Sequence, residues 1–188
     1  PHLINYLMAL GILVVQKDRV EGDDIIGTLT RIATDARMDV IISTGDKDMA
    51  QLIDNDVRIY DVFKDVIWDK KNIRERMGVQ APQVRDLLTL VGDAVDGIQG
   101  VPGCGAKTAA RLLTQYGDLD TIIANLDHIP GKIQTSIRDN LENIKLDKVL
   151  TTIVQDLELG VYIQDMMIGK PDWYQLDELR HFLEFDSI

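Results

Sequence analysis

Short apolar, β-branched runs alternate with helix-like spacing over the first 70 residues, and this alternation constrains the fold more than any other feature. Ile12–Val15, Val40–Ile42 and Val57–Tyr60 are predicted to be buried strands. Residues 22–36 carry apolar side chains at helical intervals between the first two runs. This order is typical of a parallel sheet with right-handed crossovers. The chain is therefore predicted to begin as a Rossmann-like α/β fold, with an extra edge strand over Phe63–Trp68.

The pattern changes after Trp68, where helix-like segments follow one another with no convincing strand. We place a domain boundary near residue 78, with an α/β half over residues 1–78 and an all-α half over residues 79–188. Shorter helical segments are expected at 2–10 and 49–53. The helices expected after Trp68 cover residues 70–77, 82–91, 106–116, 118–126, 132–142, 144–155 and 175–183.

Composition excludes several protein classes. Cys104 is the single cysteine, which excludes an internal disulfide framework and fits a reducing cytoplasm. The apolar run Leu3–Val15 is too short and too interrupted to span a bilayer, and it lacks the basic leader of a signal peptide. The formal net charge of −11 argues against a nucleic-acid partner, unless several acids bind metal ions that cancel their charge locally.

Three short acidic clusters favour such a metal site. Two of them follow predicted strands, at the carboxyl edge of the sheet where open α/β folds bind ligands, and the third opens the helical half. Carboxylate oxygens suit Mg²⁺, and a pair of ions can activate water and stabilise a leaving oxygen in phosphodiester hydrolysis. The clusters consist of Glu21, Asp23 and Asp24, of Asp46 and Asp48, and of Asp93 and Asp96.

Each cluster also has an ordinary structural interpretation. Asp23 or Asp24 could cap the helix that follows, Asp46 and Asp48 could be turn and helix-surface residues, and the third cluster could be a plain loop. These interpretations are independent of one another, whereas one metal site explains the placement of all three clusters.

A glycine-rich turn, Gly100–Thr108, precedes the helix expected at 106–116. Its glycines allow a tight turn that exposes backbone N–H groups to an anion such as a DNA phosphate. A phosphate-binding loop of the NTPase type is excluded, because Ala106 separates Gly105 from Lys107. A plain helix–turn–helix connection remains the alternative. The candidate DNA-binding residues are Gly100, Gly103, Gly105, Lys107, Thr108 and Arg111, and a weaker basic group, which could be only a solvated face, comprises Lys132, Arg138, Lys145 and Lys148.

Three long segments resemble the signature blocks of one family. Val20–Leu29, Ser43–Leu52 and Gly92–Ala109 are similar, in order and spacing, to blocks of the 5′→3′ exonuclease domain of bacterial DNA polymerase I, in the flap endonuclease superfamily. A weaker similarity continues to Phe182–Phe185. The resemblance therefore covers essentially the whole chain, and it implies the PIN-like form of the α/β fold.

The resemblance implies a divalent-metal-dependent nuclease that hydrolyses DNA at 5′ ends or 5′ flaps in replication and repair. It implies two Mg²⁺ ions, which Mn²⁺ can replace. Glu21, Asp23 and Asp24 would bind the first ion, and the second would be held by Asp46, Asp48, Asp93 and Asp96.

The resemblance further implies that Gly100–Lys107 is a helix–hairpin–helix turn that grips duplex DNA and holds a K⁺ ion. The expected partners are duplex DNA and a polymerase domain later in the same parent chain, with no membrane. The expected location is the bacterial nucleoid in the cytoplasm.

The chain departs from the family pattern in two ways. Ala94, Val95, Gly97 and Gln99 replace polar or rigid residues of the third block, although the carboxylates are kept. The family's first strand, its N-terminal aspartates and a basic arch would lie before Pro1, so the sheet is expected to be incomplete at its N-terminal side. A non-catalytic DNA-binding fragment with an incomplete metal site, or a structural acidic domain, remains the alternative.

Overall fold

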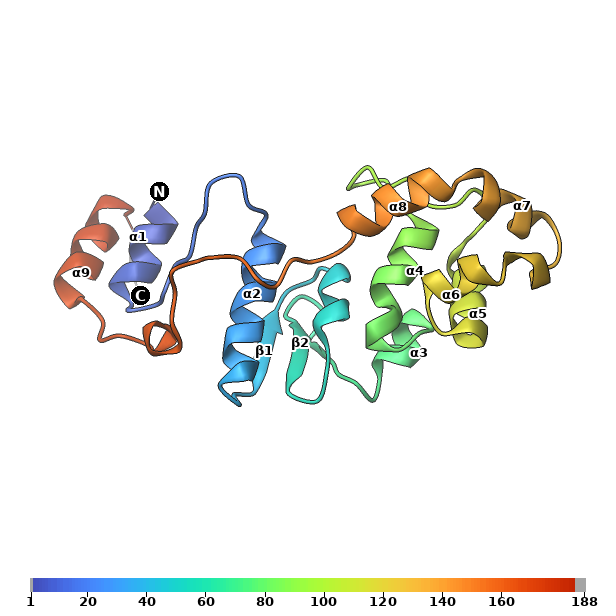
Figure 1. Cartoon of the computed structure of the whole chain (residues 1–188). Coiled ribbons are helices and arrows are strands. Elements are labelled where there is room, and N and C mark those ends of the chain that lie inside the picture. The colour runs from blue at the N-terminus through green and yellow to red at the C-terminus, as the bar shows by residue number, and fades with distance from the viewer. Residues whose placement is uncertain (1, 185–188) are drawn as a thin grey trace. The chain divides into compact units, whose positions relative to one another are not determined.

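The computed structural model describes residues 2–184, which fall into two compact units (Figure 1). The first unit combines residues 1–36 with residues 155–188, and the second comprises residues 37–154. The change from strands to helices lies between Trp68 and Ile73, inside the second unit, and the domain boundary near residue 78 stays a prediction. Phe185, the end of the C-terminal similarity, lies outside the described residues.

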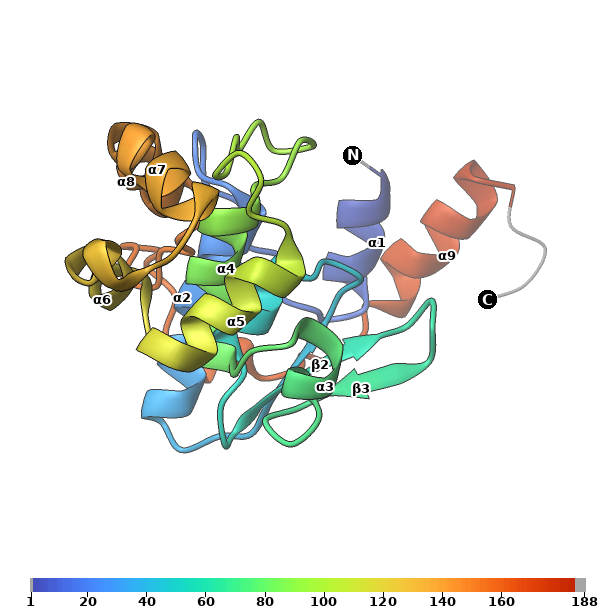
Figure 2. The same cartoon turned by 90° about the vertical axis from the view of Figure 1, so that its right-hand side faces the viewer.

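The second unit begins with a three-stranded sheet in the order β1-β2-β3. β1 (Val40–Ser43) and β2 (Val57–Asp61) are parallel and are joined through the short 3-10 helix η1 (Asp48–Leu52), which confirms both predicted strands and the helical turn between them. β3 (Val66–Trp68) folds back antiparallel to β2 as the expected edge strand (Figure 2). Alternate side chains of β2 are buried, so this strand anchors the sheet to the core.

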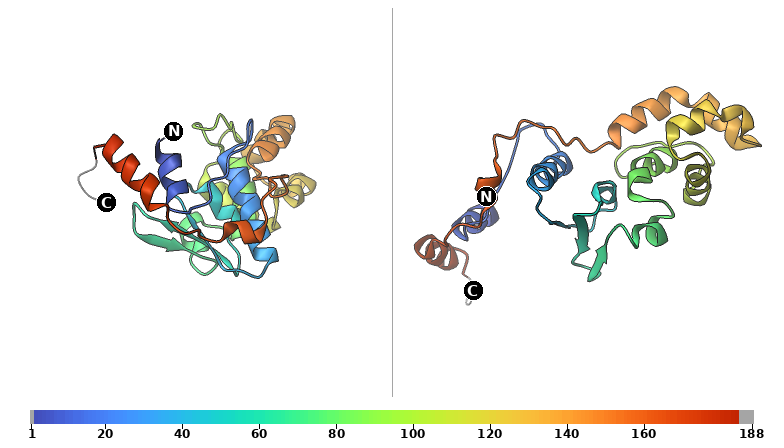
Figure 3. Two further views of the ribbon diagram at one scale, coloured as in Figure 1. Left: turned by 90° about the vertical axis from the view of Figure 1, so that its left-hand side faces the viewer. Right: turned by 60° about the horizontal axis from the view of Figure 1, so that its bottom comes forward.

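Helices make up the rest of the second unit, as predicted. The central one is α4 (Val84–Val91), which packs against η1 and two later helices and buries Val84, Leu87, Leu88 and Leu90. The green, yellow and orange ribbons in Figure 3 follow this helical part of the chain. The remaining elements are α3 (Ile73–Met77), η2 (Ala81–Gln83), α5 (Ala106–Tyr116), α6 (Leu119–Ala124), η3 (Leu126–His128), α7 (Lys132–Asp139) and α8 (Leu141–Leu150).

The last of these helices is shorter than predicted. The segment expected at 144–155 is helical only to Leu150. The hydroxyls of Thr151 and Thr152 both contact the Lys148 carbonyl oxygen, and side-chain bonds of this kind compete with continuation of a helix. The chain therefore leaves α8 at Thr151 in an extended form.

The first unit is helical in the described residues, and it corrects one prediction. Ile12–Val15 is not a strand: the segment has no ladder partner, and Ile12 and Leu13 are 38% and 41% exposed. An extended run becomes a strand only when another strand takes its N–H and C=O groups, and the described part of this unit offers none. The cluster that begins at Glu21 therefore does not follow a strand here.

The helices of the first unit are α1 (His2–Ala9), α2 (Gly22–Asp35) and α9 (Trp173–Phe182), with a 3-10 turn η4 (Ile163–Met166). α1 and α9 lie side by side (Figures 1 and 3), joined by the hydrogen bond from Asp172 N–H to the Ala9 carbonyl at 2.7 Å. α2 is tied to residues 155–157 through Thr28, whose hydroxyl accepts from Leu157 N–H at 3.3 Å.

No helix in the described residues is long and apolar enough to cross a membrane.

A buried carboxylate on α4 generates the first prediction. Asp86 is 2% exposed and accepts hydrogen bonds from Leu119 N–H (2.9 Å) and Arg85 Nε (3.0 Å), which fixes the start of α6. Asp86→Ala leaves the Leu119 N–H without a partner, and we expect it to lower the free energy of unfolding by about 1–3 kcal/mol. Asp120→Ala, which removes an exposed partner of Lys148, is the control and should cost less than about 1 kcal/mol. Equal midpoints for the two variants in urea unfolding would contradict this role.

Candidate metal centre

The loop after β1 places the first two acids of the second unit. Thr44 Oγ1 accepts a hydrogen bond from Asp46 N–H at 3.0 Å, and the Asp46 carboxylate accepts one from Asp48 N–H at 2.9 Å. The chain then enters η1, where Met49 and Ala50 are fully buried. Asp48 is therefore fixed at the carboxyl end of β1, the edge of the sheet at which the sequence analysis expected it.

The loop between α4 and α5 carries the other two acids, Asp93 and Asp96. Asp93 and Ile98 exchange two backbone hydrogen bonds (3.0 and 2.8 Å), and Asp93 Oδ1 accepts a third from Val95 N–H at 2.9 Å. Gly92 and Gly100 meet at the base of the loop with φ of +79° and +65°. A Cβ on Gly100 would lie 2.5 Å from the Gly92 nitrogen, so only glycine fits there. This crossing pins the loop at both ends.

Asp48, Asp93 and Asp96 converge from these two loops. Each offers a carboxylate oxygen, and the three oxygens all lie within 4.8 Å of one another. Asp48 Oδ1 is buried and has no hydrogen-bond partner in the described part of the chain. A buried, unpartnered carboxylate oxygen beside two other carboxylates is costly by itself but suits a hard divalent cation. The residues present therefore fit a metal ion.

A lysine partly neutralises this group. Lys47 Nζ lies 2.6 Å from Asp93 Oδ2 and forms an ion pair with it. This hydrogen bond raises the pKa of Lys47 and lowers the pKa of Asp93. The sequence analysis assigned Lys47 no role, although its position between two candidate ligands was a usable signal.

Asp48 is the member of this group whose pKa is raised. Burial, and next the negative charge of Asp46, raise the pKa of Asp48 to about 6 from its ordinary value of 3.8. Asp93 and Asp96 push the pKa in the same direction, and Lys47 opposes them. A carboxyl group whose pKa is raised by burial and like charges is characteristic of sites built for a cation or for proton transfer.

The other predicted ligands lie outside this group of three. Asp46 is exposed, and one of its oxygens is taken by the Asp48 N–H. Glu21 occupies the N-cap position of α2 but makes no side-chain cap, while Asp23 and Asp24 are half-buried in the first turn. These last three acids belong to the first unit, so their contribution to the same metal site stays a prediction.

The glycine-rich turn leads into α5 as predicted. Val101 and Cys104 are buried, whereas Gly103, Gly105 and Lys107 are exposed. The first N–H groups of a helix have no partner within it, so this turn presents donors to solvent. Within residues 2–184 the Lys107 and Arg111 side chains form no ion pair or hydrogen bond. The turn can therefore receive an anion.

The weaker basic group is mostly neutralised. Arg138 pairs with Asp127, Lys145 with Glu142 and Lys148 with Asp120, at 2.7–2.8 Å. These pairs favour the interpretation of a solvated helical face.

Comparisons with known proteins agree with this arrangement. Residues 1–78 match the N-terminal resolvase-like domain of the 5′-3′ exonucleases, and residues 79–174 match their C-terminal domain, described as a SAM fold. The chain belongs to the 5′-3′ exonuclease family. Among curated relatives, the DNA polymerase I of Pseudomonas aeruginosa is 40% identical over 187 residues, which cover 95% of this chain and 20% of the relative. That of Caldicellulosiruptor bescii is 38% identical over 198 residues, covering 100% of this chain and 23% of the relative.

Solved structures share the α/β sheet and the helical region that follows it. The T5 D15 protein co-crystallised with metal ions aligns with a TM-score of 0.68 at 20% identity, covering 90% of this chain and 61% of the other. The catalytic core of Rad2 in complex with DNA aligns with a TM-score of 0.60 at 15% identity, covering 96% and 62%. The chain thus spans about a fifth of its curated relatives and about three fifths of these structures.

The raised pKa of Asp48 predicts an unusual pH dependence in metal-free buffer. Because the folded-state pKa is about 6 and the ordinary value is 3.8, the folded state binds the Asp48 proton more tightly than the unfolded state does. This group therefore stabilises the fold less as pH rises through 6. The free energy of unfolding of the unsubstituted chain relative to Asp48→Asn should fall from about pH 4 to about pH 6.5 and level off above about pH 7, as measured by urea unfolding with a chelator.

Asp139→Asn, which changes an exposed acid on α7, is the control and should show no such trend. If the difference in free energy of unfolding between the unsubstituted chain and Asp48→Asn stays constant or rises with pH, burial and repulsion do not raise the pKa of Asp48.

Proposed function

We propose that this chain forms the metal-binding and DNA-binding part of a divalent-metal-dependent 5′-nuclease. The observation that carries the proposal is the convergence of Asp48, Asp93 and Asp96 within 4.8 Å, with Asp48 Oδ1 buried and unpartnered. Family membership supports the same activity, and one related structure is described as T5 5′-exonuclease with divalent zinc ions bound.

Seven carboxylates are the ligands proposed for two Mg²⁺ ions, with Mn²⁺ as a substitute. Asp46, Asp48, Asp93 and Asp96 hold one ion, and Glu21, Asp23 and Asp24 hold the other. Bound metal would supply a nucleophilic water at neutral pH and stabilise the leaving oxygen. The carboxylates themselves orient the ions, and Lys47 offsets part of their negative charge until the metal binds.

The substrate proposed is duplex DNA with a 5′ end or a 5′ flap. The turn from Gly100 to Thr108, with Lys107 and Arg111 beside it, binds a backbone phosphate through exposed N–H groups and positive charge, and main-chain carbonyls of the turn hold a K⁺ ion. The T5 D15 protein and Rad2 are both described in complexes with DNA. A polymerase domain later in the parent chain and a place in the bacterial nucleoid complete the proposal.

A second candidate function is DNA binding without cleavage. It is favoured by the number of ligands, because only three carboxylates come together within the second unit. In that case the hairpin would bind DNA normally while phosphodiester hydrolysis stayed near background.

DNA binding at the hairpin can be tested through its salt dependence. Each phosphate contact contributes about one unit to the slope of log K against log salt. Lys107→Ala should weaken binding about equally for unrelated duplex sequences and lower the slope by about one unit. Lys145→Ala, which removes a lysine already paired with Glu142, is the matched control. Unchanged binding of Lys107→Ala in fluorescence anisotropy would remove this contact from the proposal.

Cleavage is expected to separate the two candidate functions. Two-metal hydrolysis depends on fixed ligands, and a displacement of about 1 Å can cost about 100-fold in rate. We expect residues 1–188 alone to bind Mn²⁺ and duplex DNA but to cut a 5′-flap substrate very slowly. A protein of the full length of the curated relatives that contains this segment should cut rapidly, and Asp46→Asn in that protein should abolish cutting.

Rapid Mg²⁺-dependent cleavage by the 188-residue chain would show that these ligands suffice. An inactive full-length protein that still binds duplex DNA would favour the non-catalytic function.

A further inference from the structure

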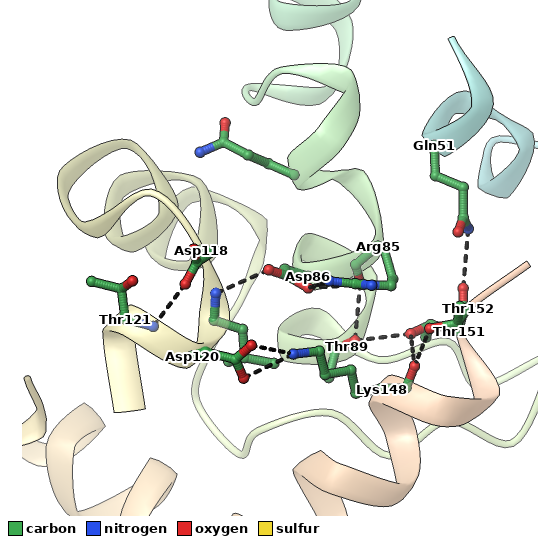
Figure 4. Close-up of polar contacts among 12 residues, drawn as sticks. Gln51, Arg85, Asp86, Thr89, Asp118, Asp120, Thr121, Lys148, Thr151 and Thr152 are labelled. Carbon is green, nitrogen blue, oxygen red and sulfur yellow. Dashed lines mark hydrogen bonds and ion pairs between the residues drawn. The ribbon is translucent and has the colours of Figure 1, made fainter. Parts of the chain in front are cut away.

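A network of hydrogen bonds connects η1 and α4, the two elements next to the candidate metal ligands. η1 begins with Asp48, and α4 ends two residues before Asp93. Figure 4 shows that both elements reach Thr151, the residue at the C-terminal end of α8, through Gln51 on η1 and Thr89 on α4. None of these three residues is a candidate ligand.

Gln51 uses both ends of its side-chain amide. Nε2 donates to the Thr151 carbonyl at 3.0 Å and to the Asp48 carbonyl at 3.1 Å, and Oε1 accepts from Ile153 N–H at 3.2 Å. One side chain thus holds the backbone of a metal-ligating residue and the backbone that follows α8. An amide can satisfy both partners only with one orientation of its donor and acceptor ends, so these contacts fix the turn that presents Asp48.

The second part of this hydrogen-bond network is a pair of buried hydroxyl groups. Thr89 Oγ1 and Thr151 Oγ1 lie 2.9 Å apart, and the two residues are 0% and 6% exposed. Thr89 Oγ1 also lies 2.9 Å from the Arg85 carbonyl oxygen one turn earlier in α4. Buried hydroxyls of this kind are costly to leave unpaired, so they resist a shift of α8 along α4.

We propose that Gln51, Thr89 and Thr151 are positioning residues that set the spacing between Asp48 and the Asp93–Asp96 pair and thereby the affinity of the site for a divalent ion. The inference rests on the proposed function and deepens it. Groups that orient metal ligands, without touching the metal, typically change its affinity by about 10–100-fold when they are removed. Apolar packing of η1 against α4 holds the elements together but lacks the direction of a hydrogen bond.

Gln83 provides a matched control within the same unit. Its Nε2 donates to the Leu113 and Gly117 carbonyls at 2.9 and 2.7 Å, and its Oε1 accepts from Gln80 N–H at 3.1 Å. Gln83 is half-buried, as Gln51 is, and it joins η2 to α5 rather than to a ligand-bearing loop. Gln51→Met and Gln83→Met therefore each remove two donated hydrogen bonds and one accepted hydrogen bond, with the same change of side-chain shape.

The test is Mn²⁺ affinity of the 188-residue chain, measured by electron paramagnetic resonance of free Mn²⁺ alongside urea unfolding. Both variants should lose similar stability, but only Gln51→Met should bind Mn²⁺ more weakly, by about tenfold or more. Thr151→Val should weaken binding in the same direction, and Thr151→Ser, which keeps the hydroxyl, should restore it. If Gln51→Met does not fold, the Thr151 pair carries the test.

Equal Mn²⁺ affinity of Gln51→Met and the unsubstituted chain, or equal losses in Gln51→Met and Gln83→Met, would overturn the inference. Failure of the unsubstituted chain to bind Mn²⁺ would instead overturn the proposed metal site. The two failures are therefore distinguishable in one titration.

Discussion

Repulsion between like charges is the constraint on which the rest of the second unit depends. Carboxylate oxygens of Asp48, Asp93 and Asp96 lie within 4.8 Å of one another, and Asp48 is also partly desolvated. Without a cation such a group favours separation of the loops that carry it. The fold opposes this with backbone geometry: two turns before η1, a pair of backbone hydrogen bonds across the second loop, and a glycine crossing that no larger residue could make. Lys47 supplies a partial counter-charge. The scaffold thus offsets the electrostatic repulsion between the three carboxylates, and a bound metal ion would relieve part of this repulsion and so stabilise the fold.

The same scaffold joins the three carboxylates to the glycine-rich turn. Gly100 closes the ligand loop and also begins the turn, and its N–H donates to Asp147 Oδ2 on α8 at 2.9 Å. Asp147 is 3% exposed, one turn before Thr151, which is bonded to α4 and η1. A displacement of the turn therefore acts on α8, and α8 is bonded to both ligand-bearing elements. One set of hydrogen bonds thus links the glycine-rich turn to the elements that carry the candidate metal ligands.

Local patterns predicted much of this structure, and their failures have a common physical cause. The strands at 40–43 and 57–61, the helices after Trp68 and the placement of Asp48 beyond β1 all follow from periodicity and turn chemistry within short windows. Ile12–Val15 has the composition of a strand but finds no partner in the described part of its unit, and pairing cannot be read from composition. Gln51 and Thr89 were missed because their partners lie 100 and 62 residues away. A glutamine or threonine in a helical segment has no sequence signal for such a contact. Likewise, three of the seven proposed ligands lie in the other unit, where local patterns carry no information about convergence.

The net charge of −11 shows why a global property is a poor guide to a local site. Exposed charges separated by more than about 10 Å are largely screened at ordinary ionic strength, so a DNA phosphate responds to the groups nearest to it. At the hairpin those groups are Lys107, Arg111 and the N–H donors of a helix start, none of which is paired with an acid in the described residues. Elsewhere in the second unit, Arg138, Lys145 and Lys148 are each paired with a carboxylate, which removes them as competing phosphate sites. The unpaired positive groups at the hairpin thus give the proposed phosphate contact a local charge opposite to the net charge of the chain.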